Sequence, residues 1–322
     1  MAEAEGPSAV SFETGHEEMI HDAQLDYYGK RVATASSDRT IKIFELQGKK
    51  QTLISELKGH TGPVWQVSWG HPTHGNLLAS CSYDRRVCIW QELNKNRWQR
   101  IHEESSHMSS VNSVCWAPHE FGRVLACASA DGTVSVLEFK NNKWERCSFM
   151  AHAGGVNAVS WAPAIPSGSL VAQSGQSPPL QKRMVTGGCD NKIKIWKFNE
   201  MKGTWDEQPC LKDQGKKHRA WVRDVAWAPS LGLPGNTIAS ASEDRTVCIW
   251  TEGKTGIIEP TKEIPCKDKV WRVSWSTMGN ILAVSSGSST VTLWKESVDG
   301  KWQNLADCEE GLVNKSETKG AQ

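Results

Sequence analysis

The sequence lacks the features of a membrane-spanning or secreted protein. No window of its 322 residues approaches the run of about 18 apolar residues that a membrane-spanning helix needs. The N-terminal string MAEAEGPSAVSFE is acidic and has neither a basic start nor an apolar stretch, so it does not resemble a signal peptide. We therefore expect the protein to be made and kept in the cytosol.

An excess of charge is also missing, and so are closely spaced cysteines. The chain has 37 Lys and Arg residues against 36 Asp and Glu residues, so its net charge is +1. This charge is too small to favour DNA or RNA as a direct partner, because such binding depends on basic side chains that neutralise phosphates. The ten cysteines include no CxxC pair. Because several of them lie in apolar, strand-like segments, we expect buried reduced thiols rather than disulfides or a metal site. These are Cys81, Cys88, Cys115, Cys127 and Cys248.

The sequence also shows no motif of an enzyme. It has no glycine-rich loop that would bind phosphates, no nucleophile elbow and no unique pair of carboxylates. We therefore expect no catalytic residues, no cofactor and no small-molecule substrate.

What the sequence does contain is an internal repeat. A short motif, usually a Ser, one residue, an Asp and an alternating apolar stretch, recurs with the turn residue six positions before an aromatic residue or Leu. The copies are SSDRTIKIF (36–44), SYDRRVCIW (82–90), SADGTVSVL (129–137), GCDNKIKIW (188–196), SEDRTVCIW (242–250) and SGSSTVTLW (286–294).

A second element precedes each copy, and it ends in Trp in every repeat except the first. Short β-branched runs bounded by turn residues, about four per repeat, are typical of the blades of a β-propeller. We therefore predict an all-β fold, a six-bladed WD-repeat β-propeller over residues 16–308, in which many of the 16 Trp residues have repeated places. The second elements are IHDAQL (20–25), VWQVSW (64–69), VNSVCW (111–116), VNAVSW (156–161), VRDVAW (222–227) and VWRVSW (270–275).

Polar residues recur together with these strands. A His precedes the second element in repeats 1 to 5, and the pattern resembles the WD-repeat family, in which His, Ser or Thr, Asp and Trp form a hydrogen-bonded tetrad. A catalytic triad is needed once, whereas these residues recur blade after blade, so we interpret them as structural. The complete tetrads that we predict are His60, Ser82, Asp84 and Trp90 in repeat 2, and His218, Ser242, Asp244 and Trp250 in repeat 5.

The other repeats depart from this pattern. Repeat 1 ends in Phe44, repeat 3 ends in Leu137, and repeat 4 has Gly188 in place of the Ser. Repeat 6 lacks the His and has Ser288 in place of the turn Asp. We therefore expect the sixth blade to be the least rigid.

The two ends of the repeat array predict an open ring. After Trp294 the segment 302–306 looks like the outer strand of earlier repeats, so blade 6 has four strands of its own. Residues 8–14 are then a surplus strand within the N-terminal segment 1–15. Blades 1 and 6 would face each other across a seam, which strands added by a partner could cover. The candidate seam residues are Val10, Phe12, Ile20, Val32, Ile41, Ile43, Val273, Leu282, Val291 and Leu293, and the sequence does not reveal which of them point into the seam.

Two further segments stand outside the repeat. Residues 164–183 form an insertion rich in Ser, Gly, Gln and Pro, which we interpret as a flexible loop, with a docking segment as the alternative. The polar tail 309–322 is expected to be disordered.

Several longer strings resemble the Sec-thirteen family of WD-repeat proteins. They are SCSYDRRVCIW (80–90), VNSVCWAPHEFG (111–122), GGCDNKIKIW (187–196), WVRDVAWAPSLGLP (221–234) and VTLWKESVDGKW (291–302), and the resemblance covers residues 17–302. It implies an open propeller that serves the outer cage of the COPII vesicle coat, in ER-to-Golgi transport, and the Y-shaped scaffold of the nuclear pore. In both assemblies an α-solenoid protein, the large COPII outer-coat subunit or a nucleoporin, would insert a blade.

The resemblance also implies where the protein acts. It places the protein at ER exit sites, on COPII vesicles and at the nuclear envelope, with membrane association only through these assemblies, and it adds a link to TOR signalling. The alternative hypothesis is an adaptor that reads peptides on the narrow face of the ring. Its candidate residues, near the start of each inner strand, are His21, Trp65, Asn112, Asn157, Trp221, Arg223 and Trp271.

Overall fold

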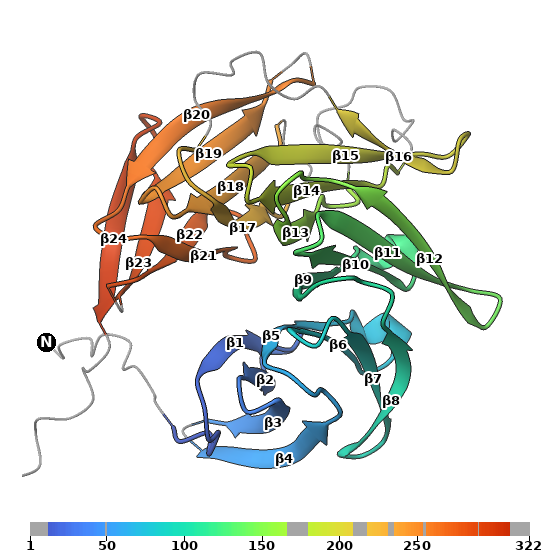
Figure 1. Ribbon diagram of the computed structural model, residues 1–322. Helices are drawn as coiled ribbons and strands as arrows, with labels where there is room; N and C mark the ends of the chain where they lie inside the picture. The colour runs from blue at the N-terminus through green and yellow to red at the C-terminus, as the bar shows by residue number, and fades with distance from the viewer. Residues whose placement is uncertain are drawn as a thin grey trace, which may run out of the picture.

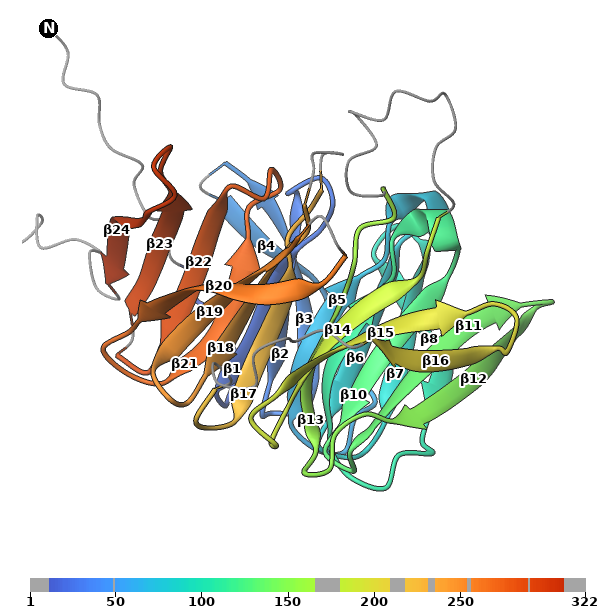
Figure 2. The same cartoon turned by 90° about the horizontal axis from the view of Figure 1, so that it is seen from above.

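The computed structural model describes residues 12–48, 50–165, 180–208, 218–230, 235–253, 256–288 and 290–309. These residues form six four-stranded antiparallel sheets, arranged as blades around a centre (Figures 1 and 2). The prediction of a six-bladed, all-β propeller is therefore confirmed. Val10, most of the 164–183 insertion and the tail after residue 309 lie outside the described residues.

Each blade uses four strands that are consecutive in the chain. Blade 1 contains β1 (Ile20–Leu25), β2 (Arg31–Ser36), β3 (Thr40–Gln47) and β4 (Lys50–Lys58). Blade 2 contains β5 (Val64–Trp69), β6 (Leu77–Ser82), β7 (Val87–Asn94) and β8 (Arg97–Glu104). Blade 3 contains β9 (Val111–Trp116), β10 (Val124–Ser129), β11 (Thr133–Lys140) and β12 (Lys143–Met150).

The second half of the chain repeats this arrangement. Blade 4 contains β13 (Val156–Trp161), β14 (Arg183–Gly188), β15 (Ile193–Asn199) and β16 (Thr204–Gln208). Blade 5 contains β17 (Val222–Trp227), β18 (Thr237–Ser242), β19 (Thr246–Glu252) and β20 (Ile258–Pro265). Blade 6 contains β21 (Val270–Trp275), β22 (Ile281–Ser286), β23 (Thr290–Glu296) and β24 (Trp302–Glu309).

The described residues contain only two helices, both single 3-10 turns after inner strands. They are η1 (Pro72–His74) and η2 (His119–Phe121). Within the part of the chain that the structure describes, no helix is long and apolar enough to cross a membrane.

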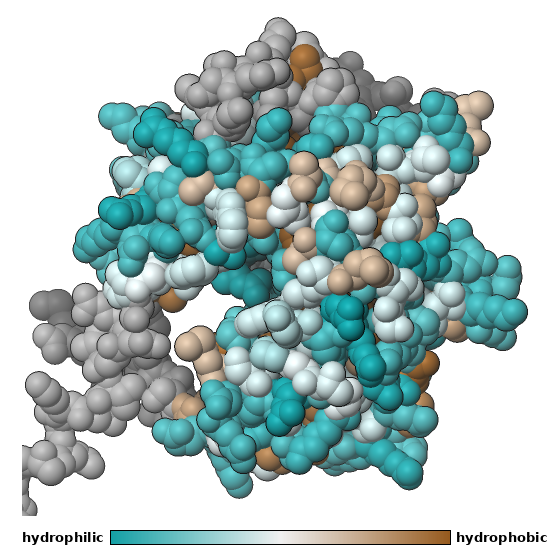
Figure 3. Space-filling view, in the orientation of Figure 1, coloured by the Kyte–Doolittle hydropathy of each residue, from teal (hydrophilic) through white to brown (hydrophobic). Residues whose placement is uncertain are grey.

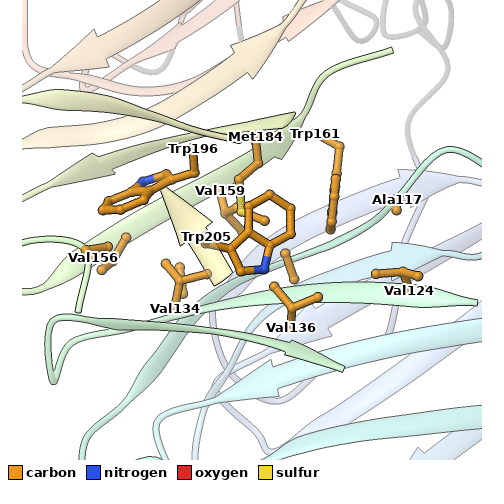
Figure 4. Close-up of a cluster of buried hydrophobic side chains, with 13 residues drawn as sticks. Ala117, Val124, Val134, Val136, Val156, Val159, Trp161, Met184, Trp196 and Trp205 are labelled. Atoms are coloured by element: carbon orange, nitrogen blue, oxygen red, sulfur yellow. The ribbon is translucent and has the colours of Figure 1, made fainter. Parts of the chain in front are cut away.

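The hydrophobic core lies between the blades rather than within them. Figure 4 shows one such cluster, in which Val134 and Val136 of blade 3 pack against Val159, Met184 and Trp196 of blade 4. Similar clusters join blades 1 and 2, 2 and 3, 4 and 5, and 5 and 6. No cluster of the described residues joins blade 6 to blade 1.

The inner strands show the same interruption. Neighbouring inner strands pack side by side in five places, from β1 against β5 through to β17 against β21, whereas β21 and β1 do not pack in this way. In Figure 1 the sheet β21–β24 and the sheet β1–β4 face each other with no sheet between them. We refer to this place as the seam.

Candidate partner-binding seam

Within blade 2 the recurring polar residues form a closed hydrogen-bonded set. His60 Nδ1 lies 3.0 Å from a carboxylate oxygen of Asp84, and His60 Nε2 lies 2.8 Å from Ser80 Oγ. The Trp90 indole donates to the same Ser80 oxygen at 2.9 Å. Burial alone would lower the pKa of His60, but the hydrogen bonds and charges of Asp84 and Cys88 together outweigh burial and raise the pKa to about 9. The side chains of this buried set satisfy one another's hydrogen-bonding groups, which is a structural role.

The structure corrects the serine that we predicted for these tetrads. In blade 2 the tetrad serine is Ser80, whereas the predicted Ser82 donates to the Gly62 carbonyl at 3.1 Å. In blade 5, His218 and the Trp250 indole both contact Ser240, whereas the predicted Ser242 donates to the Ala220 carbonyl. Residues two apart in a strand share a face, so both serines of each blade point the same way.

Blade 4 has a tetrad that the sequence analysis missed. His152 lies 2.8 Å from Asp190 and 2.8 Å from Thr186, and the Trp196 indole donates to Thr186 at 2.9 Å. Gly188 is required by the histidine, because a Cβ atom there would lie 2.5 Å from the His152 ring. Thr186, two positions before this glycine, was the signal that could have revealed the tetrad.

Blade 6 keeps the turn but not the tetrad. Cys266 stands where the other blades have His, four positions before the inner strand. The Ser288 hydroxyl lies 2.8 Å from that of Ser286 and 2.7 Å from that of Thr290, and the Trp294 indole donates to Thr292 at 2.8 Å. This blade therefore lacks the buried His–Asp link that joins the turn to the preceding loop elsewhere.

Each interface between blades has a forward side and a back side. The forward face of a blade points toward the next blade in the chain and carries two residues of its second strand and two of its third strand. In blades 1 to 5 all of these residues are buried. They are Ala33, Ala35, Ile41 and Ile43; Ala79, Cys81, Val87 and Ile89; Ala126, Ala128, Val134 and Val136; Val185, Gly187, Ile193 and Ile195; and Ala239, Ala241, Val247 and Ile249.

The forward face of blade 6 follows the same pattern but is uncovered. Its residues are Ala283, Ser285, Val291 and Leu293, again small residues on the second strand and branched aliphatic residues on the third. Val291 is 39% exposed, and the other three are only partly buried. Blade 6 therefore carries the residues of an interface between blades on a face that no described residue covers.

The structure separates the predicted seam residues into two groups. Val291 and Leu293 lie on the forward face of blade 6, and Ile20 and Val32 lie on the back face of blade 1, where Ile20 is 40% exposed. The other four candidates, whose direction the sequence had left open, point away from the seam, because neighbouring strand residues point to opposite sides. Ile41 and Ile43 are buried against blade 2, and Val273 and Leu282 are buried against blade 5.

Part of the back face of blade 1, around Phe44 and Lys42, is already covered by the N-terminal residues. The Phe12 ring lies 5.2 Å from the Phe44 ring, edge to face, and Lys42 donates to the carbonyls of Thr14 and Gly15. Phe44 is only 4% exposed. The N-terminal residues 12–16 thus lie along the blade 1 wall of the seam, while the blade 6 wall stays open. The space-filling view shows the molecule hollowed on this side, from the centre of the ring outward (Figure 3).

Arg272 is the residue of blade 6 that reaches across the ring. The third residue of other inner strands carries a side-chain acceptor, such as the carboxylate of Asp22 or Asp224. Each of these carboxylates accepts a hydrogen bond from a backbone N–H of the next blade, with nitrogen-to-oxygen distances of 3.1 and 3.0 Å. Arg272 can only donate, and its guanidinium reaches the Trp65 carbonyl of blade 2 at 3.3 Å. Burial raises the pKa of Asp22, and it raises the pKa of Asp224 to about 6, while the nearby Arg272 opposes both shifts.

The narrow-face candidates mostly connect neighbouring blades. The Trp65 indole donates to Ser110 at 2.9 Å, and the side-chain amides of Asn112 and Asn157 donate to the carbonyls of Val156 and Val222. The His21 ring lies against the Trp65 ring, with centroids 4.5 Å apart.

Three narrow-face candidates form a separate stack. The Arg223 guanidinium lies 5.1 Å from the ring centroids of Trp221 and Trp271, and it pairs with Glu243. Trp221 and Trp271 are 48% and 42% exposed. No group of side chains suited to a metal ion occurs among the described residues.

Two protein-family models match this chain, and the first of them covers most of the repeats. The family described as "WD domain, G-beta repeat" matches residues 8–45, 51–91, 144–197, 210–251 and 258–295. A family described as "Anaphase-promoting complex subunit 4 WD40 domain" matches residues 72–164.

Curated proteins of similar sequence share one name, "Protein transport protein SEC13". The relative from Cryptococcus neoformans is 52% identical over 265 residues, which cover 76% of this chain and 78% of the relative. The relative from Emericella nidulans is 52% identical over 246 residues and covers 74% and 78%. The relative from Mycosarcoma maydis is 47% identical over 284 residues and covers 77% and 76%.

A solved structure supports the fold alone. A chain of the "Crystal Structure of Mitotic Checkpoint Complex" is similar with a TM-score of 0.67 and 19% identity, over 88% of this chain and 76% of that chain.

Proposed function

We propose that this chain, which belongs to the SEC13 family of WD-repeat proteins, is a non-catalytic scaffold of protein transport whose ring is completed by a blade from a partner. The observation that carries the proposal is the forward face of blade 6. Ala283, Ser285, Val291 and Leu293 repeat the interface pattern of the other blades, yet Val291 is 39% exposed. Apolar strand residues exposed together usually mark a binding surface.

The partner is an α-solenoid protein that contributes strands. Added strands would bury the blade 6 wall in the way that each other blade buries the forward face before it. Membership of the SEC13 family supports the large outer-coat subunit of COPII and an α-solenoid nucleoporin as the two partners. The sites of action are then ER exit sites and vesicle coats, in ER-to-Golgi transport, and the nuclear pore.

A scaffold role agrees with the chemistry of the His and Asp pairs that recur within this chain. Closed sets of His, Asp and Ser or Thr recur in blades 2, 4 and 5, and in each the hydroxyl oxygen accepts a Trp indole. A nucleophile needs its oxygen free to attack a substrate, and these oxygens are buried and bonded. The repeated His–Asp pairs therefore hold the blades together rather than perform catalysis.

The test is co-purification of the solenoid partner with variants of the two candidate surfaces. Leu293→Asp places a charge on the blade 6 wall, and a Trp221→Ala, Trp271→Ala double variant removes the exposed indoles of the narrow face. We expect Leu293→Asp to abolish recovery of the α-solenoid subunit and the double variant to retain it. Retention by Leu293→Asp together with loss by the double variant would overturn the proposal in favour of a narrow-face adaptor.

A further inference from the structure

Neighbouring blades share a second contact besides their apolar faces. The Trp that ends an inner strand donates its indole N–H to a backbone carbonyl of the preceding inner strand. This occurs four times, with donor-to-acceptor distances between 2.9 and 3.0 Å. The pairs are Trp69 with Gln24, Trp116 with Ser68, Trp161 with Cys115, and Trp275 with Ala226. We call this contact the indole clasp.

The acceptor is always the residue one position before the end of its inner strand. Among the inner strands that end in Trp and follow a blade of this chain, blade 5 differs: the Trp227 indole donates to the Asn236 side chain, and the Trp227 backbone N–H donates to the Ser160 hydroxyl. The clasp thus depends on a fixed register between two inner strands that run in the same direction.

At the seam both halves of the clasp are incomplete. The corresponding carbonyl on blade 6 belongs to Ser274, an exposed residue that no described indole reaches. Blade 1 has Leu25 where the other five blades have Trp, and Leu25 is 58% exposed. The chain therefore lacks the indole on the inner strand that has no blade of this chain before it, and the inner strand before the seam offers a carbonyl that no described indole reaches.

We infer that the innermost strand of the partner's blade runs in the same direction as β21 and ends in a tryptophan whose indole N–H donates to the Ser274 carbonyl. This inference rests on the proposed function, because it describes the blade that fills the seam. The partner blade then makes an indole clasp on its blade 6 side only, since the side chain of Leu25 has no N–H to form one from blade 1.

The side-chain acceptor that other inner strands offer to the next blade cannot substitute for the indole clasp here. On blade 6 the third residue of the inner strand is Arg272. Its side chain has no acceptor atom and donates to the Trp65 carbonyl. A strand that enters beside β21 therefore gains no side-chain acceptor at that level. The Ser274 carbonyl is the polar anchor that remains in the repeated geometry, with Val291 and Leu293 supplying apolar burial.

The experiment adds a surrogate seventh blade of known sequence. A copy of residues 60–104, which is blade 2 with its preceding loop, is fused ahead of the full chain. In the native ring the back face of blade 2 packs on Ala33, Ala35, Ile41 and Ile43 of blade 1. This set resembles the open forward face of blade 6, so the copy should be able to pack there. Two variants carry Phe at one position of the copy. One is Trp69→Phe, which removes the clasp, and the control is Trp98→Phe, whose indole nitrogen is buried without a partner.

The measurement is hydrogen exchange of backbone amides in 281–296. We expect the unmodified copy and the Trp98→Phe control to slow exchange strongly relative to the unfused chain. The Trp69→Phe copy should exchange about fivefold faster than the control, the factor expected for one net hydrogen bond. Equal protection by both variants would overturn the indole clasp and leave the seam proposal standing. No protection from any copy would instead contradict the proposed seam itself.

Discussion

Blade 2 and blade 6 follow the same pattern on their forward faces and differ in what covers it. Val87 and Val291 occupy equivalent positions on the third strand, yet Val87 is fully buried and Val291 is 39% exposed. Blade 2 is also tied by a buried tetrad, whereas blade 6 has Cys266 and Ser288 in the places of its His and Asp. The comparison teaches that the sequence of a blade prepares its interface, while the neighbour determines whether that interface is buried.

The largest expected effect comes from placing the same charge on both blades. Val87→Glu should lower the free energy of unfolding by more than about 4 kcal/mol, because the carboxylate would be buried without a partner. Val291→Glu should change it by less than about 1 kcal/mol, because the side chain can reach water. Urea denaturation of the two variants measures both values. A similar large loss for Val291→Glu would mean that the blade 6 wall is covered in the free protein.

The tetrad gives the second contrast between these blades. Asp84→Ala should lower the free energy of unfolding by about 3 kcal/mol, since it strands the buried His60. Ser288→Ala removes an exposed hydroxyl and should cost less than about 0.5 kcal/mol. Thermal and denaturant unfolding of the two variants would be compared. Equal losses would contradict the view that blade 6 lacks a stabilising tetrad.

The pH dependence of stability should also reflect the tetrads. Burial lowers the pKa values of His60 and His218, but Asp84 with Cys88, and Asp244 with Cys248, together outweigh it and raise both values to about 9. A raised pKa stabilises the fold fully below the unfolded value near 6.5, and this contribution disappears as pH rises through about 9. Each histidine should therefore contribute up to about 3 kcal/mol that is lost across this interval.

The control for this prediction removes one of the two histidines. Denaturation of the native protein and of His60→Gln would be measured at pH 6.5 and at pH 9.5. The difference between them should shrink at the higher pH. A difference that stays constant would show that His60 is neutral in the folded protein.

The smallest effect distinguishes the two walls of the seam. Ile20 on blade 1 is 40% exposed, which matches Val291 on blade 6. Because the blade 1 wall is partly covered by residues 12–16 and lacks an indole clasp, Ile20→Glu should weaken partner binding by less than about threefold, roughly 0.6 kcal/mol. Val291→Glu should abolish measurable binding in the same titration. Equal losses at the two positions would show that the partner contacts both walls alike.

The sequence was sufficient for the architecture because the repeat spacing predicts both the number of blades and their strand order. It was not sufficient for the tetrad serines. Ser80 and Ser82 are two apart in one strand and share a face, so spacing alone cannot choose between them. For the same reason, the sequence did not reveal that Thr186, two positions before Gly188, is the hydroxyl residue of the blade 4 tetrad.

The seam was harder to predict, because alternation shows that a strand has two faces without showing which neighbour each face meets. Ile41 and Val32 lie on adjacent strands of blade 1, but one contacts blade 2 and the other faces the seam. Comparison between blades resolves this point, since Ile41 corresponds to Val87 and Val291. The vacant acceptor at Ser274 could be recognised only after the structure had shown which carbonyl each indole reaches.

The most direct test of the account is hydrogen exchange of the full-length protein with and without its co-purified α-solenoid partner. The comparison is between residues 281–296 of blade 6 and the equivalent residues 77–92 of blade 2. We expect the partner to slow exchange in 281–296 and to leave 77–92 unchanged, because among the described residues the forward face is buried in blade 2 and uncovered in blade 6. Protection confined to the narrow face around Trp221 and Trp271, with none in 281–296, would contradict the account.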